Sequence, residues 1–376
     1  MHIHSSFDGG NIEVVSADRP DDIRLRIRPD VGERHLQWFY FQLDGASGID
    51  CRLRIENAAA VSYPEGFEGY RAVASTDRLH WYRVDTRLEN GQLIIEDRPE
   101  ADVVWYAYFA PYSQQDHQQL IAAALEDERV SAETLCLTPD GRPHTLLTIG
   151  RPDADRLAIW VIARQHPGET MAQWWVEGFL DRLLDPEDPS ARALLALSVV
   201  YLVPCMCLDG AVRGHLRCNA RGRNLNREWA EPSEDDSPEV YFTRQKMHAT
   251  GVDLCFDVHG DEALPYNFIA GAEGTPSWND RKQHQLDTFK GLLAAISPDF
   301  QTEHGYAVDA PGSSDLRKNT DYMAETFDCL AMTLEMPFKD NADLPMPDIG
   351  WSPGRCRHLG AACVDAFRRI VPELRR

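Results

Sequence analysis

Leu157-Ala-Ile-Trp-Val-Ile-Ala163 is an uninterrupted apolar run with the length of one buried β-strand. The tetrad His166-Pro-Gly-Glu169 follows it, and Thr170-Met-Ala-Gln-Trp-Trp-Val-Glu-Gly-Phe-Leu-Asp-Arg-Leu-Leu184 then has the apolar spacing of an amphipathic helix. The order strand, tight turn, helix is typical of an α/β sheet, in which sites form on the turns that follow the strands. The tetrad therefore lies where such a fold places its chemistry.

The same alternation continues through the rest of the chain from about residue 116. The pattern predicts a helix around 119–125, two strands within 133–149, a strand over 252–256 and a last helix over roughly 354–370. Strands that alternate with helices in this way favour a mixed, mostly parallel sheet covered by helices on both faces.

The first 114 residues have a different pattern. Apolar and polar residues alternate over short stretches such as Ile23-Arg-Leu-Arg-Ile-Arg28, and turn residues such as Asn90-Gly91 separate them. This pattern predicts an N-terminal antiparallel β-sandwich. We therefore expect an α/β protein with two domains, a β-sandwich over 1–114 and a catalytic α/β domain over 115–376.

Composition limits the partners and the compartment. The net charge is −22, which disfavours nucleic acid and anionic membranes as partners. No run of 18 apolar residues is present, and the first residues lack the basic and apolar regions of a signal peptide. The nine cysteines have no disulfide-framework spacing, which favours reduced thiols and a cytoplasmic location. The sequence leaves a homo-oligomer open.

The tetrad supplies a histidine and a carboxylate, and a second histidine completes a metal-binding set. His259 closely follows the mostly apolar run Val252-Asp-Leu-Cys-Phe256, so it is also expected at a strand end. Two imidazoles and one carboxylate form the ligand set that holds a catalytic Zn²⁺ with one position left open. One H-x-x-E match is weak evidence in a chain with 13 histidines, but the strand-end placement of both segments predicts one Zn²⁺ per chain, bound by His166, Glu169 and His259.

Two other features suggest groups that work beside such a metal. Glu335 stands in the otherwise apolar strand Cys329-Leu-Ala-Met-Thr-Leu-Glu-Met-Pro-Phe338, where a carboxylate is costly unless it has a partner or a task. We therefore predict that Glu335 is the general base. Residues 209–229 contain five arginines without a helical or strand period, and a guanidinium suits carboxylates and oxyanions.

At this point the chain resembles the zinc carboxypeptidases, and specifically the cytosolic carboxypeptidase subfamily and its bacterial relatives. The resemblance covers nearly the whole chain. It implies that Arg217, in Gly214-His-Leu-Arg-Cys-Asn219, stabilises the oxyanion, and that Asn226 and Arg227 bind the terminal carboxylate of the substrate. It also implies the same metal ligands and the same base, and a peptide or protein C-terminus as the substrate.

The N-terminal segment resembles the β-domain that marks this subfamily. The matching motifs occur in order along the chain and are separated from one another. They are Phe7-Asp-Gly-Gly-Asn-Ile12, Gln37-Trp-Phe-Tyr-Phe41, Ile55-Glu-Asn57, Trp81-Tyr-Arg83 and Val104-Trp-Tyr-Ala-Tyr-Phe-Ala-Pro-Tyr112.

The chain departs from the family at two places. Asn224 stands where the family usually has an aspartate, and the tyrosine that closes over substrate has no clean counterpart, with Tyr306 as the nearest candidate and Tyr322 as the second. The subfamily typically removes acidic residues, chiefly glutamate, which implies a basic group in the side-chain pocket. Arg317 and Lys318 are the candidates for that group.

Two other functions remain open from the sequence. An aspartoacylase-like zinc amidohydrolase shares the ligand pattern and an Asn-Arg pair but acts on small N-acyl amino acids. Alternatively, the β-domain is a binding module beside a vestigial zinc site. The preceding β-domain disfavours the first, and the presence of metal ligands, base and arginine together disfavours the second.

Overall fold

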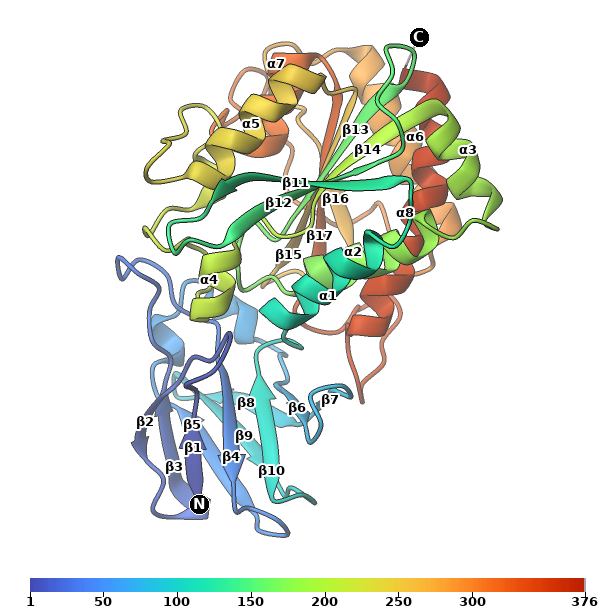
Figure 1. Cartoon of the computed structure of the whole chain (residues 1–376). Helices are drawn as coiled ribbons and strands as arrows, with labels where there is room; N and C mark the ends of the chain where they lie inside the picture. Colours follow the sequence, from blue (N-terminus) through green and yellow to red (C-terminus); the bar gives the residue numbers. More distant parts are fainter. Residues whose placement is uncertain (375–376) are drawn as a thin grey trace.

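The computed structural model describes residues 1–374 of the chain. Ten short strands form the N-terminal part, and an α/β layer structure follows (Figure 1). The predicted boundary between residues 114 and 115 stays a prediction; it falls at the first residue of α1 (Gln114–Ala124), whose N-cap Ser113 makes a capping box with Asp116.

The N-terminal strands form two five-stranded sheets. One sheet has the order β1 (His2–His4), β4 (Tyr40–Asp44), β10 (Val103–Ala107), β6 (Val73–Ser75) and β7 (Tyr82–Arg83). The other has the order β2 (Glu13–Ser16), β3 (Ile23–Arg26), β5 (Cys51–Ile55), β9 (Gln92–Asp97) and β8 (Asp85–Glu89). All neighbours are antiparallel except β3 and β5, which run parallel. Short 3₁₀ turns connect them at η1 (Pro20–Asp22), η2 (Ala58–Ala60) and η3 (Pro64–Phe67).

A seven-stranded mixed sheet forms the second part. Its order is β11 (Val130–Leu137), β12 (Pro143–Ile149), β14 (Ser198–Val203), β13 (Leu157–Ala163), β15 (Leu254–Asp261), β17 (Leu330–Pro337) and β16 (Phe268–Ala270). The four central strands from β14 to β17 are parallel, and the outer ones are antiparallel. The helices are α2 (Met171–Leu183), α3 (Pro189–Leu197), α4 (Leu208–Arg213), α5 (Pro238–Thr250), α6 (Asp280–Ile296), α7 (Asn319–Phe327) and α8 (Pro353–Leu374).

The apolar run of β13 is continuous because both of its faces are buried. Ile159 and Val161 pack in the cluster that contains the side chains of α2 and α8, whereas Trp160 and Ile162 pack in the cluster that contains those of α5 and α7. Successive side chains of a strand point to opposite faces, so a strand between two helix layers needs apolar residues at every position. Figure 1 shows α5 and α7 on one side of the sheet and α3, α6 and α8 on the other.

The predicted fold class is confirmed, with differences in detail. The helix expected after the tetrad is α2, and the last helix is α8. His259 lies inside β15, which continues to Asp261, and Glu335 lies inside β17 as predicted. The two residues are direct partners in the parallel register. All nine cysteines are free of disulfides, as expected for reduced thiols. Among residues 1–374, no helix combines the length and the apolar character needed to cross a bilayer.

Candidate active site

The turn after β13 is built around an arginine in an unusual backbone conformation. Arg164 has a φ of 56°, in the left-handed region that residues with a Cβ rarely adopt. Its buried guanidinium donates to the carbonyls of Pro167 at 2.8 Å and Tyr112 at 3.0 Å, and to the Gln173 side chain. These contacts hold the chain in the reversal that aims the following histidine over the carboxyl ends of the strands.

The turn also needs a glycine, because another backbone segment passes close to it. The amide of Gly168 donates to the carbonyl of Leu216 at 2.9 Å. A Cβ at position 168 would lie 3.0 Å from that same oxygen. The close approach places the backbone of Leu216, next to Arg217, directly beside the tetrad.

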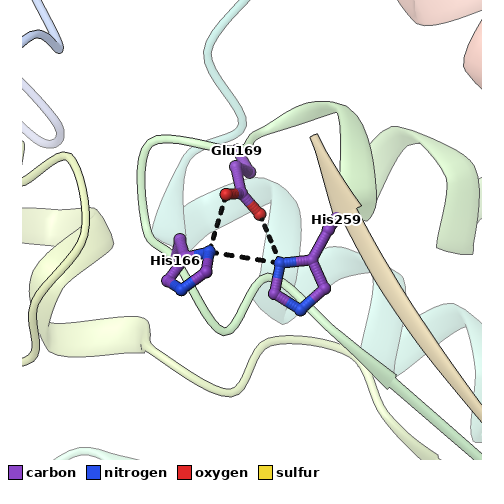
Figure 2. Close-up of side chains that lie close together, drawn as sticks. All are labelled: His166, Glu169 and His259. Atoms are coloured by element: carbon purple, nitrogen blue, oxygen red, sulfur yellow. Dashed lines mark hydrogen bonds and ion pairs between the residues drawn. The ribbon is translucent and has the colours of Figure 1, made fainter. Parts of the chain in front are cut away.

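The structure brings the three predicted metal ligands together (Figure 2). The Nδ1 atom of His166 lies 2.7 Å from one carboxylate oxygen of Glu169, and the Nδ1 atom of His259 lies 2.8 Å from the other. The two Nδ1 atoms are 3.2 Å apart, and all three side chains are buried. Two lone-pair nitrogens and one carboxylate converging from two strands fit a small divalent cation such as Zn²⁺.

A second layer of hydrogen bonds orients both imidazoles. The Nε2 atom of His259 lies 2.9 Å from Oδ2 of Asp257, and the Nε2 atom of His166 lies 3.1 Å from Oδ1 of Asn224. With a hydrogen on each Nε2 donated to these oxygens, the lone pair of each Nδ1 is available to a bound cation. Asn224, which stands where the family usually has an aspartate, therefore contacts the imidazole of His166.

The pKa shifts of His166, Glu169 and His259 are those of a group that can hold a cation. Burial and the nearby Arg217 lower the pKa of His166 to about 3, so this imidazole is neutral. Burial opposes ionisation of Glu169, but His166 and His259 outweigh it and lower the pKa of the carboxyl. Burial also disfavours a charged His259, yet Asp257 and Glu169 outweigh that effect and raise its pKa. A cation would replace the proton held between these groups.

Glu335 points into the same space. Glu335 is 7% exposed, and its Oε1 lies 3.3 Å from the hydroxyl oxygen of Tyr306. Its Oε2 has no hydrogen-bond partner although it is buried. Burial raises the pKa of this carboxyl well above its ordinary value; His259 opposes the rise, and Glu169 adds to it. A buried carboxylate oxygen without a partner, next to a metal set, is suited to accept a proton from a substrate group.

A cavity of about 590 Å³ joins these groups. The metal set, Glu335 and the predicted substrate groups Arg217, Asn226, Arg227 and Tyr306 all line it. The nearest approach of Arg217 to Glu169 is 4.0 Å, from Nη1 to Oε1. Asn226 and Arg227 belong to η4 (Leu225–Arg227), and the amide of Asn319 donates to Oδ1 of Asn226 at 2.8 Å.

The remaining candidates divide between the cavity and the surface. Tyr306 is 51% exposed, and its hydroxyl donates to Asp261 at 2.5 Å. Tyr322 instead contacts His248 at 3.1 Å and is not among the lining residues. Arg317 pairs with Asp315 at 2.8 Å, is well exposed and does not line the cavity.

Lys318, the other basic candidate, does line the cavity. Its ammonium lies 3.7 Å from Asp309 and 3.5 Å from Asp321. Both distances exceed a normal hydrogen bond, so the ammonium keeps donors available to a ligand.

Several residues around the site had no role in the sequence-based prediction. The role of Asp257 had a signal, because a residue two positions before His259 on the same strand shares its face. Asn224 was noted only as a departure from the family, and its contact with His166 could not be read from the sequence. Tyr63 had no signal, since its contact with Arg217 joins segments that are far apart in the chain.

A buried carboxyl, Glu239, contacts the segment that carries the predicted substrate-binding residues Arg217 and Arg227. The side-chain amide of Asn219 donates to Oε2 of Glu239 at 3.2 Å, while its oxygen accepts the amides of Arg221 and Arg223 at 3.0 Å each. Glu239 is fully buried, and its Oε1 has no partner. Burial raises the pKa of Glu239 to about 7 from an ordinary value of 4.5, with a smaller contribution from Asp209.

We expect this carboxyl to make stability fall as the pH rises. Because the folded pKa of Glu239 is above the unfolded one, the folded state binds the proton more tightly, and stability is lost between pH 4.5 and about 7. Glu239→Gln should therefore increase the free energy of unfolding at pH 8 by on the order of 3 kcal/mol, and much less at pH 5. Urea unfolding at both pH values measures this difference, with exposed Glu234→Gln as the control. An equal effect of Glu239→Gln at both pH values would contradict it.

Comparison with known proteins agrees with this architecture. The sequence model of the zinc carboxypeptidase family matches residues 119–350. The sequence model of the cytosolic carboxypeptidase N-terminal domain matches residues 3–109. Cytosolic carboxypeptidase 2 of Xenopus tropicalis is 30% identical over 336 residues, which are 80% of this chain but only 34% of that protein.

Two solved bacterial structures are similar over their whole length. The metallo-carboxypeptidase of Burkholderia cenocepacia is 46% identical with a TM-score of 0.97, covering 99% of each chain. The metallo-carboxypeptidase of Pseudomonas aeruginosa, solved in complex with (2-guanidinoethylmercapto)succinic acid, is 43% identical with a TM-score of 0.96, covering 100% of each. With its fold, its convergent His-Glu-His set and both family matches, the chain belongs to the zinc carboxypeptidase family and is a metallo-carboxypeptidase.

Proposed function

We propose that this enzyme uses one Zn²⁺ to hydrolyse the last peptide bond of a peptide or protein and that it prefers an acidic C-terminal residue. The supporting observation is the single cavity that joins the metal set, an unpartnered carboxylate oxygen and three basic side chains. His166, Glu169 and His259 would hold the ion. When bound, Zn²⁺ supplies Lewis acidity, which polarises a carbonyl and lowers the pKa of water.

The side chains around the ion have separate roles in this proposal. Glu335 accepts a proton from the attacking water as the carbon–oxygen bond forms, and passes it to the leaving amine as the carbon–nitrogen bond breaks. Arg217 donates to the oxygen that gains negative charge. Tyr306 lines the cavity beside Glu335, with its hydroxyl oxygen 3.3 Å from Oε1 of that residue.

Asn226 and Arg227 would bind the free α-carboxylate, which limits cleavage to the last residue. Nη1 of Arg227 donates to the carbonyl of Asn226 at 2.6 Å, whereas its Nε lies 3.9 Å from Asp315, too far for a normal hydrogen bond. Arg227 suits this role because that edge of the guanidinium keeps donors for a carboxylate. Asn226 lies beside it with a fixed side chain. A planar guanidinium next to an amide matches the geometry of a carboxylate.

Arg227→Ala is expected to raise KM by about 10- to 100-fold, with a smaller effect on kcat. A hydrogen bond to a charged group contributes about 1.5–3 kcal/mol, and the α-carboxylate is bound in the ground state as well as the transition state. Steady-state kinetics on a blocked peptide measures both constants. Arg223→Ala is the matched control, because Arg223 belongs to the same segment but pairs with Asp236 at 2.9 Å. An unchanged KM in Arg227→Ala would contradict the assignment.

The proposed preference for an acidic residue rests on Lys318. Lys318 is a basic residue that lines the cavity in addition to the arginines. In the sequence it lies between Tyr306 and β17. A side-chain carboxylate of the substrate would offer it a closer partner than Asp309 or Asp321 does.

Peptides that differ only in a final Glu, Lys or Phe test this preference. We expect Lys318→Met to lower kcat/KM for the peptide ending in Glu by about 10-fold, since a charged hydrogen bond of about 1.5 kcal/mol is lost, and to leave the peptide ending in Phe within about 2-fold. Arg317→Met is the control, because Arg317 is the exposed neighbour of Lys318, pairs with Asp315 and does not line the cavity. A wild-type preference for Phe or Lys would reject the acidic pocket without affecting the zinc carboxypeptidase assignment.

A further inference from the structure

A buried aspartate of the N-terminal part reaches the backbone that carries Arg217. Asp30 lies between β3 and β4, and its side chain is 2% exposed. Its Oδ1 accepts the amide of Leu216 at 2.6 Å, and its Oδ2 accepts the amides of Arg217 at 2.7 Å and Cys218 at 2.9 Å. Three consecutive amides that converge on one carboxylate fix the backbone on both sides of Arg217.

A tyrosine of the same part supports the side chain of Arg217. The guanidinium carbon lies 5.3 Å from the centre of the Tyr63 ring, within the range of a cation–π contact. Tyr63 also lines the active-site cavity. Gln37, fully buried, holds its backbone, because Oε1 accepts the Tyr63 amide and Nε2 donates to the Tyr63 carbonyl, each at 2.9 Å.

The two parts of the chain also interlock just before Arg217. The side chain of Asn11 donates to the carbonyl of Gly214 at 2.8 Å. Gly214 has a φ of 71°, and a Cβ there would lie 2.8 Å from the carbonyls of Gly9 and Gly10. The segment therefore follows the N-terminal part too closely to move independently of it.

We infer that Asp30 and Tyr63 are positioning residues for catalysis, so the N-terminal β-domain completes the active site of the α/β domain. The inference rests on the proposed role of Arg217 at the oxyanion. Glu169, 4.0 Å away, attracts the guanidinium toward the metal set, so its place depends on the support behind it. A misplacement of about 1 Å at a catalytic group can cost about 100-fold in rate.

The first experiment uses the full-length protein and compares Asp30→Asn with Asp97→Asn. Asp97 is the matched control, because it is a partly buried aspartate of the same domain whose Oδ2 accepts the Tyr106 hydroxyl at 2.7 Å, away from the Arg217 segment. Amide hydrogen exchange of residues 214–219 should become at least about 10-fold faster in Asp30→Asn and stay unchanged in Asp97→Asn. Unchanged exchange in Asp30→Asn would overturn the inference. This readout does not require peptidase activity.

The second experiment is a double-mutant cycle with Arg217→Ala. We expect Asp30→Asn to lower kcat by about 10- to 100-fold with zinc content unchanged and KM within about 2-fold, because the oxyanion contact acts in the transition state. In the Arg217→Ala background the same substitution should change kcat by less than about 2-fold, since the group that it positions is gone. Factors that multiply in the double variant would assign Asp30 a general structural role and overturn the inference.

Tyr63 provides an independent variant if Asp30→Asn does not fold. Tyr63→Leu removes the ring beneath Arg217 and should lower kcat by about 5-fold, in line with about 1 kcal/mol for a cation–π contact, whereas Tyr63→Phe keeps the ring and should stay near wild type. Equal kcat values for Tyr63→Leu and wild type would overturn the inference. If wild type released no C-terminal residue, the proposed function would fail instead, and the exchange data would still decide whether Asp30 holds the segment.

Discussion

Glu335→Gln is expected to bind Zn²⁺ as the wild type does and to lower kcat by about 10²- to 10⁴-fold, the usual contribution of a general base. Glutamine keeps the shape of the side chain and its oxygen beside the Tyr306 hydroxyl, but it cannot take a proton. The substitution replaces the buried, unpartnered Oε2 with an NH₂ group. The oxygen expected to accept the proton is therefore lost.

Zinc content by elemental analysis and single-turnover kinetics on a blocked peptide measure this pair of effects. Glu325→Gln is the control, since its carboxylate accepts the Ser277 amide at 2.9 Å outside the cavity. A near-normal kcat in Glu335→Gln would show that another group takes the proton. Loss of zinc in the same variant would show that Glu335 holds the ion rather than the proton.

His259→Ala is expected to lower zinc affinity by more than about 100-fold and to abolish peptidase activity. Loss of an outer hydrogen-bond partner of a zinc ligand already costs about 10- to 100-fold in affinity, and loss of the ligand itself costs more. The substitution also leaves Asp257 and Glu169 as two buried carboxylates without the imidazole between them.

Zinc per chain after dialysis, together with activity after zinc is restored, measures the effect. His144→Gln is the matched control, because His144 is equally buried but contacts Thr243 at 2.9 Å away from the metal set. Full zinc occupancy in His259→Ala would contradict the ligand assignment, whereas zinc loss in His144→Gln as well would indicate a general effect of replacing a buried histidine.

The sequence predicted the parts of the site whose geometry is local. The apolar run before His166 and the helix after Glu169 place both ligands on one turn, and a turn fixes the positions of residues three apart. His259 and Glu335 were recognised from their surroundings in apolar strands. Their direct pairing across β15 and β17 could not be read from the sequence, because strand register depends on tertiary packing.

The sequence could not reveal the residues that hold the active-site segments in place. Asp30 is 187 residues from Arg217 in the chain, and nothing in its local pattern distinguishes it from an exposed turn aspartate. For the same reason the sequence could not show whether Arg317 or Lys318 lines the cavity. Adjacent residues in a loop point in directions that only the folded backbone decides, and here Lys318 lines the cavity while Arg317 does not.

The comparisons decide among the functions that the sequence left open. The N-terminal match and the zinc carboxypeptidase match occur together, and both bacterial structures cover nearly all of this chain. This combination favours peptide C-termini over small N-acyl amino acids as substrates.

The most direct test of the central claim is mass spectrometry of a blocked peptide incubated with the enzyme, with chelator, and with chelator followed by one equivalent of Zn²⁺. The account predicts loss of the C-terminal residue alone, no cleavage with chelator, and recovery of cleavage with zinc. Cleavage that persists without metal, or fragments cut within the peptide, would contradict it.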